Sequence, residues 1–102
     1  MYIDSNLCYV TIDVTNKDSY GIDLIIEFVN HGEDLNVKNT FIILIGSTTE
    51  LYVISNFMLK IKHGTSETTL HIQQNILNGI VDMIQLVFTA KTGDIMSNTV
   101  YI

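Results

Sequence analysis

The sequence predicts an all-β fold, a two-sheet antiparallel β-sandwich of about eight or nine strands in one domain over residues 1–102. Apolar and polar residues alternate along several short runs, which is the period of a strand that buries one of its faces. A chain of 102 residues that is 47% hydrophobic has the size and the apolar content of one domain with one core. Glycines recur close to the spacing expected of strands joined by turns, at Gly21, Gly32, Gly46, Gly64, Gly79 and Gly93.

The first half of the chain contains four predicted strands. Two of them alternate, and their inward faces are Cys8, Val10, Ile12 and Val14, and then Ile22, Leu24, Ile26 and Phe28. Short polar side chains that bond to their own backbone favour turns, so residues 16–19 and 30–34 are expected to follow these strands. Residues 40–45 and 51–54 are two apolar, β-prone runs separated by the polar segment 46–49, and they predict a further pair of strands.

The stretch from residue 57 to residue 90 predicts three more strands in succession. Their inward faces are expected to be Phe57, Leu59 and Ile61, then Leu70 and Ile72, and then Ile84, Leu86, Phe88 and Ala90. Residues 73–85 also fit helical spacing. However, Asn78-Gly79 is a strong hairpin signal, and a glycine inside a helix costs about 1 kcal/mol relative to alanine. We therefore expect strand, loop and strand in this region, followed by a last strand over residues 99–102.

Phe28, Gly32 and Leu35 stand where an immunoglobulin domain of the variable or intermediate type has its strand-C Trp, a turn Gly and a Leu. Residues 57–72 resemble the D–E hairpin of that family, and residues 40–53 resemble its C′–C″ ribbon. The positions that match its paired central strands in spacing are Leu70, Ile72, Asp82, Ile84, Leu86, Phe88 and Ala90. The chain lacks both disulfide cysteines, the core tryptophan and the corner tyrosine of the family. The resemblance implies that Phe88 and an inward Ile12 or Val14 fill the space of the disulfide.

The charge of the chain restricts its partners. Eleven acidic residues against five lysines give a formal net charge of −6. Phosphate binding needs clustered Lys and Arg, so nucleic acid is not an expected partner, and an anionic membrane surface is disfavoured in the same way. No run reaches the roughly 18 apolar residues of a membrane helix, so membrane insertion is not expected. The expected partner is a neutral or basic protein, or a second copy of the chain.

The single cysteine, Cys8, cannot form an intrachain disulfide, which fits a reducing compartment. The sequence shows neither the pattern of a signal peptide nor an Asn-x-Ser/Thr glycosylation site. These features favour a cytoplasmic or virion-associated location, although they do not define one.

No set of residues predicts catalysis, a metal or a cofactor, so the protein is not expected to be an enzyme. The histidines lack zinc-site spacing, Cys8 is expected to be a buried inert thiol, and no nucleophile motif is present. Carboxylates that could attract calcium are expected to be solvated turn acids, because no loop follows the EF-hand pattern. The residues considered for these sites are His31, His63 and His71, the acids Asp13, Asp18, Asp23, Glu33 and Asp34, and the basic pair Lys60 and Lys62.

The predicted function is a protein-binding or self-associating module. Under the immunoglobulin-like pattern, residues 22–29 and 84–90 are neighbours in a front sheet, and its outward residues form the predicted interface: Ile25, Glu27, Val29, Gln85 and Val87. A clustered apolar patch often marks an interface, so we expect a symmetric homodimer through this sheet, unless the C′ ribbon or a loop covers it. The alternatives are a structural subunit of a virion, phage particle or surface filament, and a carbohydrate or small-ligand module.

Overall fold

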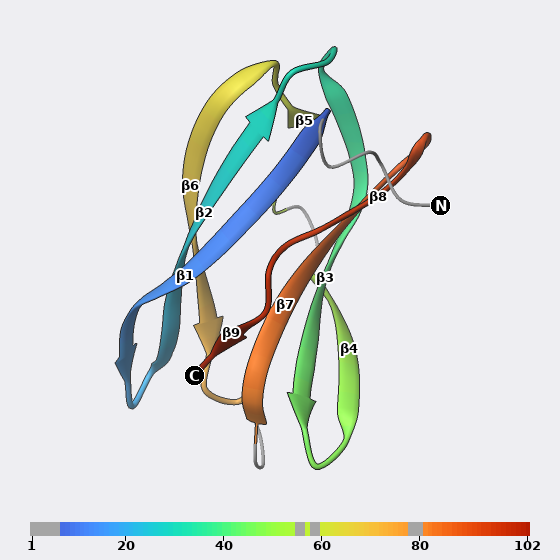
Figure 1. Ribbon diagram of the computed structural model, residues 1–102. Helices are drawn as coiled ribbons and strands as arrows, with labels where there is room; N and C mark the ends of the chain where they lie inside the picture. The colour runs from blue at the N-terminus through green and yellow to red at the C-terminus, as the bar shows by residue number, and fades with distance from the viewer. Residues whose placement is uncertain (1–6, 55–56, 58–59, 78–80) are drawn as a thin grey trace.

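The structure, a computed structural model, describes residues 7–54, 57, 60–77 and 81–102, and this part of the chain contains strands and no helix. Two antiparallel sheets pack face to face, which confirms the predicted all-β sandwich (Figure 1). The nine strands are β1 (Cys8–Asp18), β2 (Gly21–Asn30), β3 (Leu35–Gly46), β4 (Thr49–Ile54), β5 (Lys60–Ile61), β6 (Gly64–Gln73), β7 (Val81–Ala90), β8 (Gly93–Met96) and β9 (Val100–Tyr101).

One sheet has three strands in the order β1-β2-β6, and the other has six, in the order β4-β3-β7-β8 with β5 on β3 and β9 on β7. The β1–β2 hairpin turns at Ser19-Tyr20 and enters β2 at Gly21, whose φ of 140° is one that residues with a side chain rarely adopt. A Cβ atom at Gly21 would lie 2.0 Å from the carbonyl oxygen of Ile72, so glycine also lets β6 approach this turn. The predicted turn at 16–19 is therefore displaced by about two residues, because β1 continues to Asp18.

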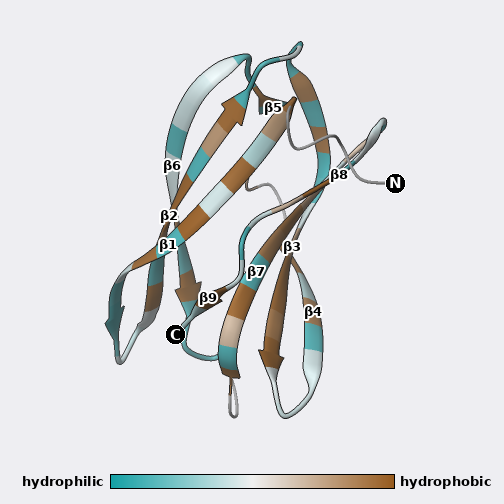
Figure 2. Cartoon of the chain, viewed as in Figure 1, coloured by the Kyte–Doolittle hydropathy of each residue, from teal (hydrophilic) through white to brown (hydrophobic). Residues whose placement is uncertain are grey.

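The core lies between the two sheets and is filled by the predicted inward residues of β1, β2 and β7 except Val14 and Ala90, which are half-buried. The alternating bands on β1 illustrate this pattern (Figure 2). Phe28 of β2 and Phe88 of β7 meet across the sandwich, with ring centroids 5.3 Å apart and an interplanar angle of 72°. The resemblance implied that Ile12 or Val14 lies beside Phe88, whereas the ring in edge-to-face contact with Phe88 is that of Phe28. The buried apolar side chains around it are Cys8, Val10, Ile12, Ile22, Leu24, Ile26, Ile42, Leu44, Ile61, Ile72, Ile84, Leu86 and Ile95.

The predicted assignment of strands to sheets is wrong for β2 and for the segment 57–62. β2 pairs with β1 and β6, whereas β7 pairs with β3, β8 and β9, so β2 and β7 lie in different sheets. The apolar run 40–45 belongs to β3, a central strand of the six-stranded sheet, instead of an edge ribbon. In the described part of segment 57–62, only β5 is a strand, and it pairs with Leu35 and Asn36 of β3. Periodicity identified the strands, but it carries no information on which strands are neighbours.

The ambiguous region 73–85 contains strand, turn and strand, as predicted. β6 ends at Gln73, residues 74–77 form a turn, and β7 begins at Val81. Of the apolar residues with helical spacing, Ile72 and Ile84 are buried and Ile76 packs against the core, whereas Met83 is on the outward side of β7 and Ile80 lies outside the described residues. The Asn78-Gly79 hairpin signal lies outside the described residues.

Candidate functional site

The outward face of the six-stranded sheet is apolar across its neighbouring strands. Ile42 and Leu44 of β3 point into the core, so the alternating residues Phe41, Ile43 and Ile45 point outward. The register places Val53 of β4 beside Phe41 and Leu51 beside Ile43. On the other side of β3, Val87 and Met83 lie beside Phe41 and Ile45. We call this surface the outer apolar face; its members are Phe41, Ile43, Ile45, Leu51, Val53, Met83, Val87 and Met96.

The exposure of this face is greatest at its β4 edge. Leu51 and Val53 keep 60% and 58% of their surface exposed, whereas Phe41, Ile43 and Val87 are half-buried by their neighbours. Large apolar side chains with this exposure cost free energy in water unless another surface covers them.

The polar side chains on this sheet face already have partners within the chain. The Gln85 amide Nε2 donates to the carbonyl oxygen of Ser97 over 2.8 Å. Thr89 Oγ1 accepts from the Asn39 N–H at 3.2 Å and lies 3.3 Å from the Asn39 carbonyl oxygen, to which it donates. The centre of the face therefore presents apolar surface and satisfied amide and hydroxyl groups. The nearest acids lie off this centre, because Glu50 of β4 is paired with the inward-facing Leu44 and Asp94 of β8 is paired with Thr89 at the border of the face.

The five predicted interface residues do not form one surface. Gln85 and Val87 lie on the sheet with the outer apolar face, whereas Ile25, Glu27 and Val29 lie on the outward side of the three-stranded sheet. The five residues are separated because β2 pairs with β1 and β6 and does not lie in the sheet of β7. The outward residues of β3 and β4 were not predicted as part of the interface. The sequence did contain a signal for them: the run 40–45 is apolar at both odd and even positions, which predicts a strand with both faces covered.

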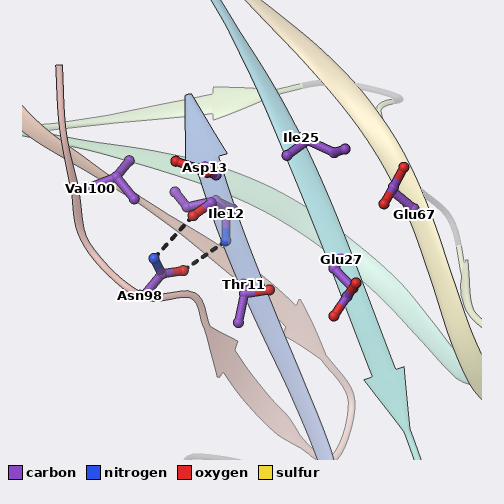
Figure 3. A pocket seen from close by; sticks show the side chains of 8 residues that line it. All are labelled: Thr11, Ile12, Asp13, Ile25, Glu27, Glu67, Asn98 and Val100. Carbon is purple, nitrogen blue, oxygen red and sulfur yellow. Dashed lines mark hydrogen bonds between the residues drawn. The ribbon is translucent and has the colours of Figure 1, made fainter. Parts of the chain in front are cut away.

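The outward side of the three-stranded sheet is polar and acidic, and it contains an open groove of about 410 Å³ (Figure 3). Its lining includes Asp13, Glu27 and Glu67. At its β1 side, the Asn98 side chain binds both backbone groups of Ile12. The Ile12 N–H donates to Asn98 Oδ1 over 2.7 Å, and Asn98 Nδ2 donates to the Ile12 carbonyl oxygen over 3.0 Å. Within the described ranges, no three His, Cys, Asp or Glu side chains are arranged to hold a metal ion.

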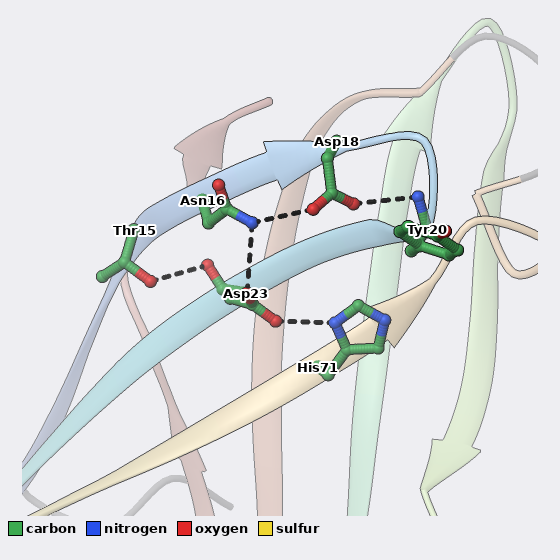
Figure 4. A network of polar contacts seen from close by, with 6 residues as sticks. All are labelled: Thr15, Asn16, Asp18, Tyr20, Asp23 and His71. Atoms are coloured by element: carbon green, nitrogen blue, oxygen red, sulfur yellow. Dashed lines mark hydrogen bonds and ion pairs between the residues drawn. The ribbon is translucent and has the colours of Figure 1, made fainter.

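A polar network joins the β1–β2 turn to β6 (Figure 4). His71 Nδ1 lies 2.6 Å from Asp23 Oδ1, and both side chains are partly exposed. This hydrogen bond lowers the pKa of Asp23 and raises the pKa of His71. Asn16 donates to Asp18 at 3.0 Å and to Asp23 at 3.4 Å. His71 is thus held by a carboxylate instead of being merely solvated, and the network stabilises the end of the sheet.

Of the remaining candidates from the sequence, Cys8 lies in the core, whereas His63 and Asp34 are joined by a hydrogen bond. Cys8 is buried, and burial raises the pKa of its thiol, which disfavours the reactive thiolate. His63 is bound to the loop before β3, because its N–H donates to Asp34 Oδ1 over 2.8 Å and its Nδ1 lies 2.8 Å from the Gly32 carbonyl oxygen.

No family model, curated protein or solved structure significantly matches the chain. In the part of the chain that the structure describes, none of the segments is a helix with the length and hydropathy needed to cross a membrane. The outer apolar face, which extends over neighbouring strands and leaves Leu51 and Val53 more than half exposed, is the candidate that the geometry of the described residues supports.

Proposed function

We propose that the protein is a non-catalytic, immunoglobulin-like module that self-associates through the outer apolar face. The strand order supports the immunoglobulin-like assignment. β1-β2-β6 corresponds to strands A, B and E of that fold, and β4-β3-β7-β8 corresponds to C′, C, F and G. On this assignment Phe28 belongs to strand B, one strand earlier than the sequence pattern suggested, and the Phe28–Phe88 contact takes the place of the B–F disulfide.

A second copy is the partner that suits this face best. Each chain carries a net charge of −6, so two copies repel one another wherever their acids come close. At the centre of the outer apolar face two copies can meet without opposing charges, because the outward positions of β3 and β7 and their partners Leu51 and Val53 on β4 are apolar, amide or hydroxyl residues. A two-fold axis through the sheet would place the same patch on both sides of the contact. The apolar surface formed by the exposed Leu51 and Val53 beside the half-buried Phe41 is the observation that carries this proposal.

The area of the face limits the affinity of such a dimer. Four strands spaced by ~4.8 Å and a paired length of ~20 Å give a flat footprint of roughly 400 Å². Standard interfaces bury ~800 Å² of accessible surface per partner, and side-chain relief raises the accessible area above the flat footprint. We therefore expect a small interface with a dissociation constant on the order of micromolar. An interface of this size gains little more free energy from burial than association costs in entropy.

Sedimentation velocity over a wide concentration range tests the proposal. The wild-type chain should shift from monomer toward dimer between about 1 µM and 1 mM, as expected for that affinity. Val87→Glu and Leu51→Glu should give folded monomers, because each buries a charge at the contact. Ile25→Glu is the matched control, since Ile25 is half-buried on the opposite sheet, and it should leave the dimer intact. A wild-type chain that stays monomeric throughout this range would refute self-association.

The exposed edge of β4 favours a second candidate, a structural subunit that assembles repetitively. In the described part of the chain β4 pairs with β3 alone, so its other edge is open beside the exposed Leu51 and Val53. Contacts that do not close on themselves generate filaments instead of dimers. Light scattering distinguishes the two functions, because a closed dimer has a plateau in size and an open assembly grows with concentration.

A further inference from the structure

β6 forms an open edge of the three-stranded sheet, on the opposite layer from the outer apolar face (Figure 1). It pairs with β2 over ten consecutive residues, from Gly64 opposite Asn30 to Gln73 opposite Gly21, without a register shift. Among the described residues, no strand lies along the other edge of β6. A long, regular edge strand is a template on which another extended segment can pair.

The chain closes the opposite edge of the same sheet. β1 has a bulge between Val14 and Asn16, and Val10 forms a parallel bridge with Ser97. The Asn98 side chain occupies both backbone groups of Ile12, as described above. β6 has none of these devices, and its sequence GTSETTLHIQ contains neither the Lys nor the Pro that commonly protects an edge. The difference between the two edges makes β6 the one at which an added strand finds free backbone groups.

The hydrogen-bond pattern identifies the backbone groups that face this open edge. The Gln74 N–H donates to the Tyr20 carbonyl oxygen over 3.0 Å, at the start of the β2–β6 ladder. In an antiparallel pair, bonding residues alternate, so with this register the even residues of β6 bond to β2. The N–H and C=O groups of Thr65, Glu67, Thr69 and His71 therefore point away from β2. An added strand can bond to each of them.

The side chains beside this edge favour a cation. Glu67 lies directly opposite Glu27, and like charges in this position destabilise a sheet. Asp13 lies two residue pairs further along, opposite Ile25 and on the same side of the sheet. None of the outward residues of β1, β2 and β6 in this region is Lys, since the positions that flank the two glutamates are Thr11, Ile25, Thr65 and Thr69. A Lys or Arg opposite Glu67 on an added strand would relieve the repulsion between the two carboxylates.

The inward residues of β6 determine which side chains an added strand should have on its core-facing side. Leu70 is half-buried and Ile72 is buried, and both face the core side of the sheet. Residues of an added strand opposite Leu70 and Ile72 would extend this apolar surface. The ligand that fits the edge thus alternates, with apolar residues facing inward and polar or basic residues facing outward.

We propose that β6 binds an extended segment of a partner protein as a fourth, antiparallel strand, with a Lys or Arg of that segment opposite Glu67. The bound segment has apolar residues at alternate positions, opposite Leu70 and Ile72. Backbone hydrogen bonds along the edge supply affinity, and the carboxylate pair selects a basic residue at one position. This inference does not rest on the proposed dimer, because it concerns the other sheet and a different group of residues.

A synthetic octapeptide tests the proposal. Its inward positions are Val, and its outward positions are Thr except for one Lys placed opposite Glu67; a second peptide has Glu in place of that Lys. Binding is measured by fluorescence anisotropy, and the contact is located by amide chemical shifts in an NMR titration. The Lys peptide should bind about 3- to 10-fold more tightly than the Glu peptide and should shift the amides of Thr65, Glu67 and Thr69. Glu67→Lys should reverse the order of the two peptides.

A backbone variant separates strand addition from simple charge attraction. Thr69→Pro removes an N–H that points to the open edge and leaves the bonds to β2 in place, so it should weaken the Lys peptide at least about threefold. Thr69→Ala keeps the N–H and should bind normally. If Thr69→Pro does not fold, the charge reversal at Glu67 decides the outcome. The proposal is overturned by the absence of amide shifts along β6, by equal binding of both peptides to wild type and Glu67→Lys, or by undiminished binding to folded Thr69→Pro.

Discussion

Removing either ring of the Phe28–Phe88 pair should be among the most destabilising single changes in the protein. Each ring is 1% exposed, and the two rings come from different sheets. A buried aromatic side chain covers ~200 Å², so Phe88→Ala should lower the free energy of unfolding by about 3–5 kcal/mol, and Phe28→Ala by a similar amount. The edge-to-face contact is worth a further ~1 kcal/mol beyond burial, and both single variants lose it.

A double-mutant cycle measures that contact. Urea denaturation of wild type, Phe28→Ala, Phe88→Ala and the double variant should show a double loss that is smaller than the sum of the single losses by about 1–3 kcal/mol. A domain of this length has a total stability of about 5–15 kcal/mol, so the double variant is measured with added osmolyte, which favours the folded state. A loss below about 1 kcal/mol for Phe88→Ala alone would contradict the core position of β7. Additive losses would contradict the contact between the rings.

Two further predictions concern redox state and pH. Because Cys8 is buried and has no second cysteine with which to pair, thermal melts of the monomer with and without reductant should agree within a few degrees, and a larger difference would contradict this. Because the pKa of His71 is raised in the folded protein, its stabilising effect is present at pH values below the ordinary pKa of histidine and is lost as the pH rises through the raised pKa. Because the pKa of Asp23 is lowered, its stabilising effect is present above the ordinary pKa of aspartate and is lost as acid protonates the carboxylate. The urea midpoint of wild type should therefore exceed that of Asp23→Asn most clearly between about pH 4 and pH 6.5. A constant difference from pH 5 to pH 9 would refute the pairing.

The strands and their buried faces could be predicted because both follow from local periodicity. The inward residues of β1 and β2 alternate with polar residues, and every second side chain of a strand points to the same side. The sequence also indicated that 73–85 is not one helix, through the glycine at position 79. These conclusions need no knowledge of which strands are neighbours.

The candidate site could not be predicted, because it depends on pairing between distant strands. Val87 reaches the outer apolar face through its register with Phe41, 46 residues earlier in the chain (87 − 41). The sequence-based prediction placed β2 in the same sheet as β7, which separates β2 from β1. Strands that are consecutive in the chain usually pair, and β1 and β2 do so here. Only β3, apolar at both parities, carried a local sign that its outward face is unusual.

The two proposed surfaces have different consequences when they are combined in one molecule. The outer apolar face belongs to the six-stranded sheet and the open β6 edge to the three-stranded sheet, so a dimer that covers the first leaves the second accessible on each copy. Two β6 edges in one dimer would bind a partner that displays two basic extended segments more tightly than either edge alone, by raising the effective concentration at the second site. Val87→Glu should then weaken binding to a two-segment partner while leaving the affinity for a single peptide unchanged. Loss of both would show that the face and the edge depend on each other, which their separation on different sheets argues against.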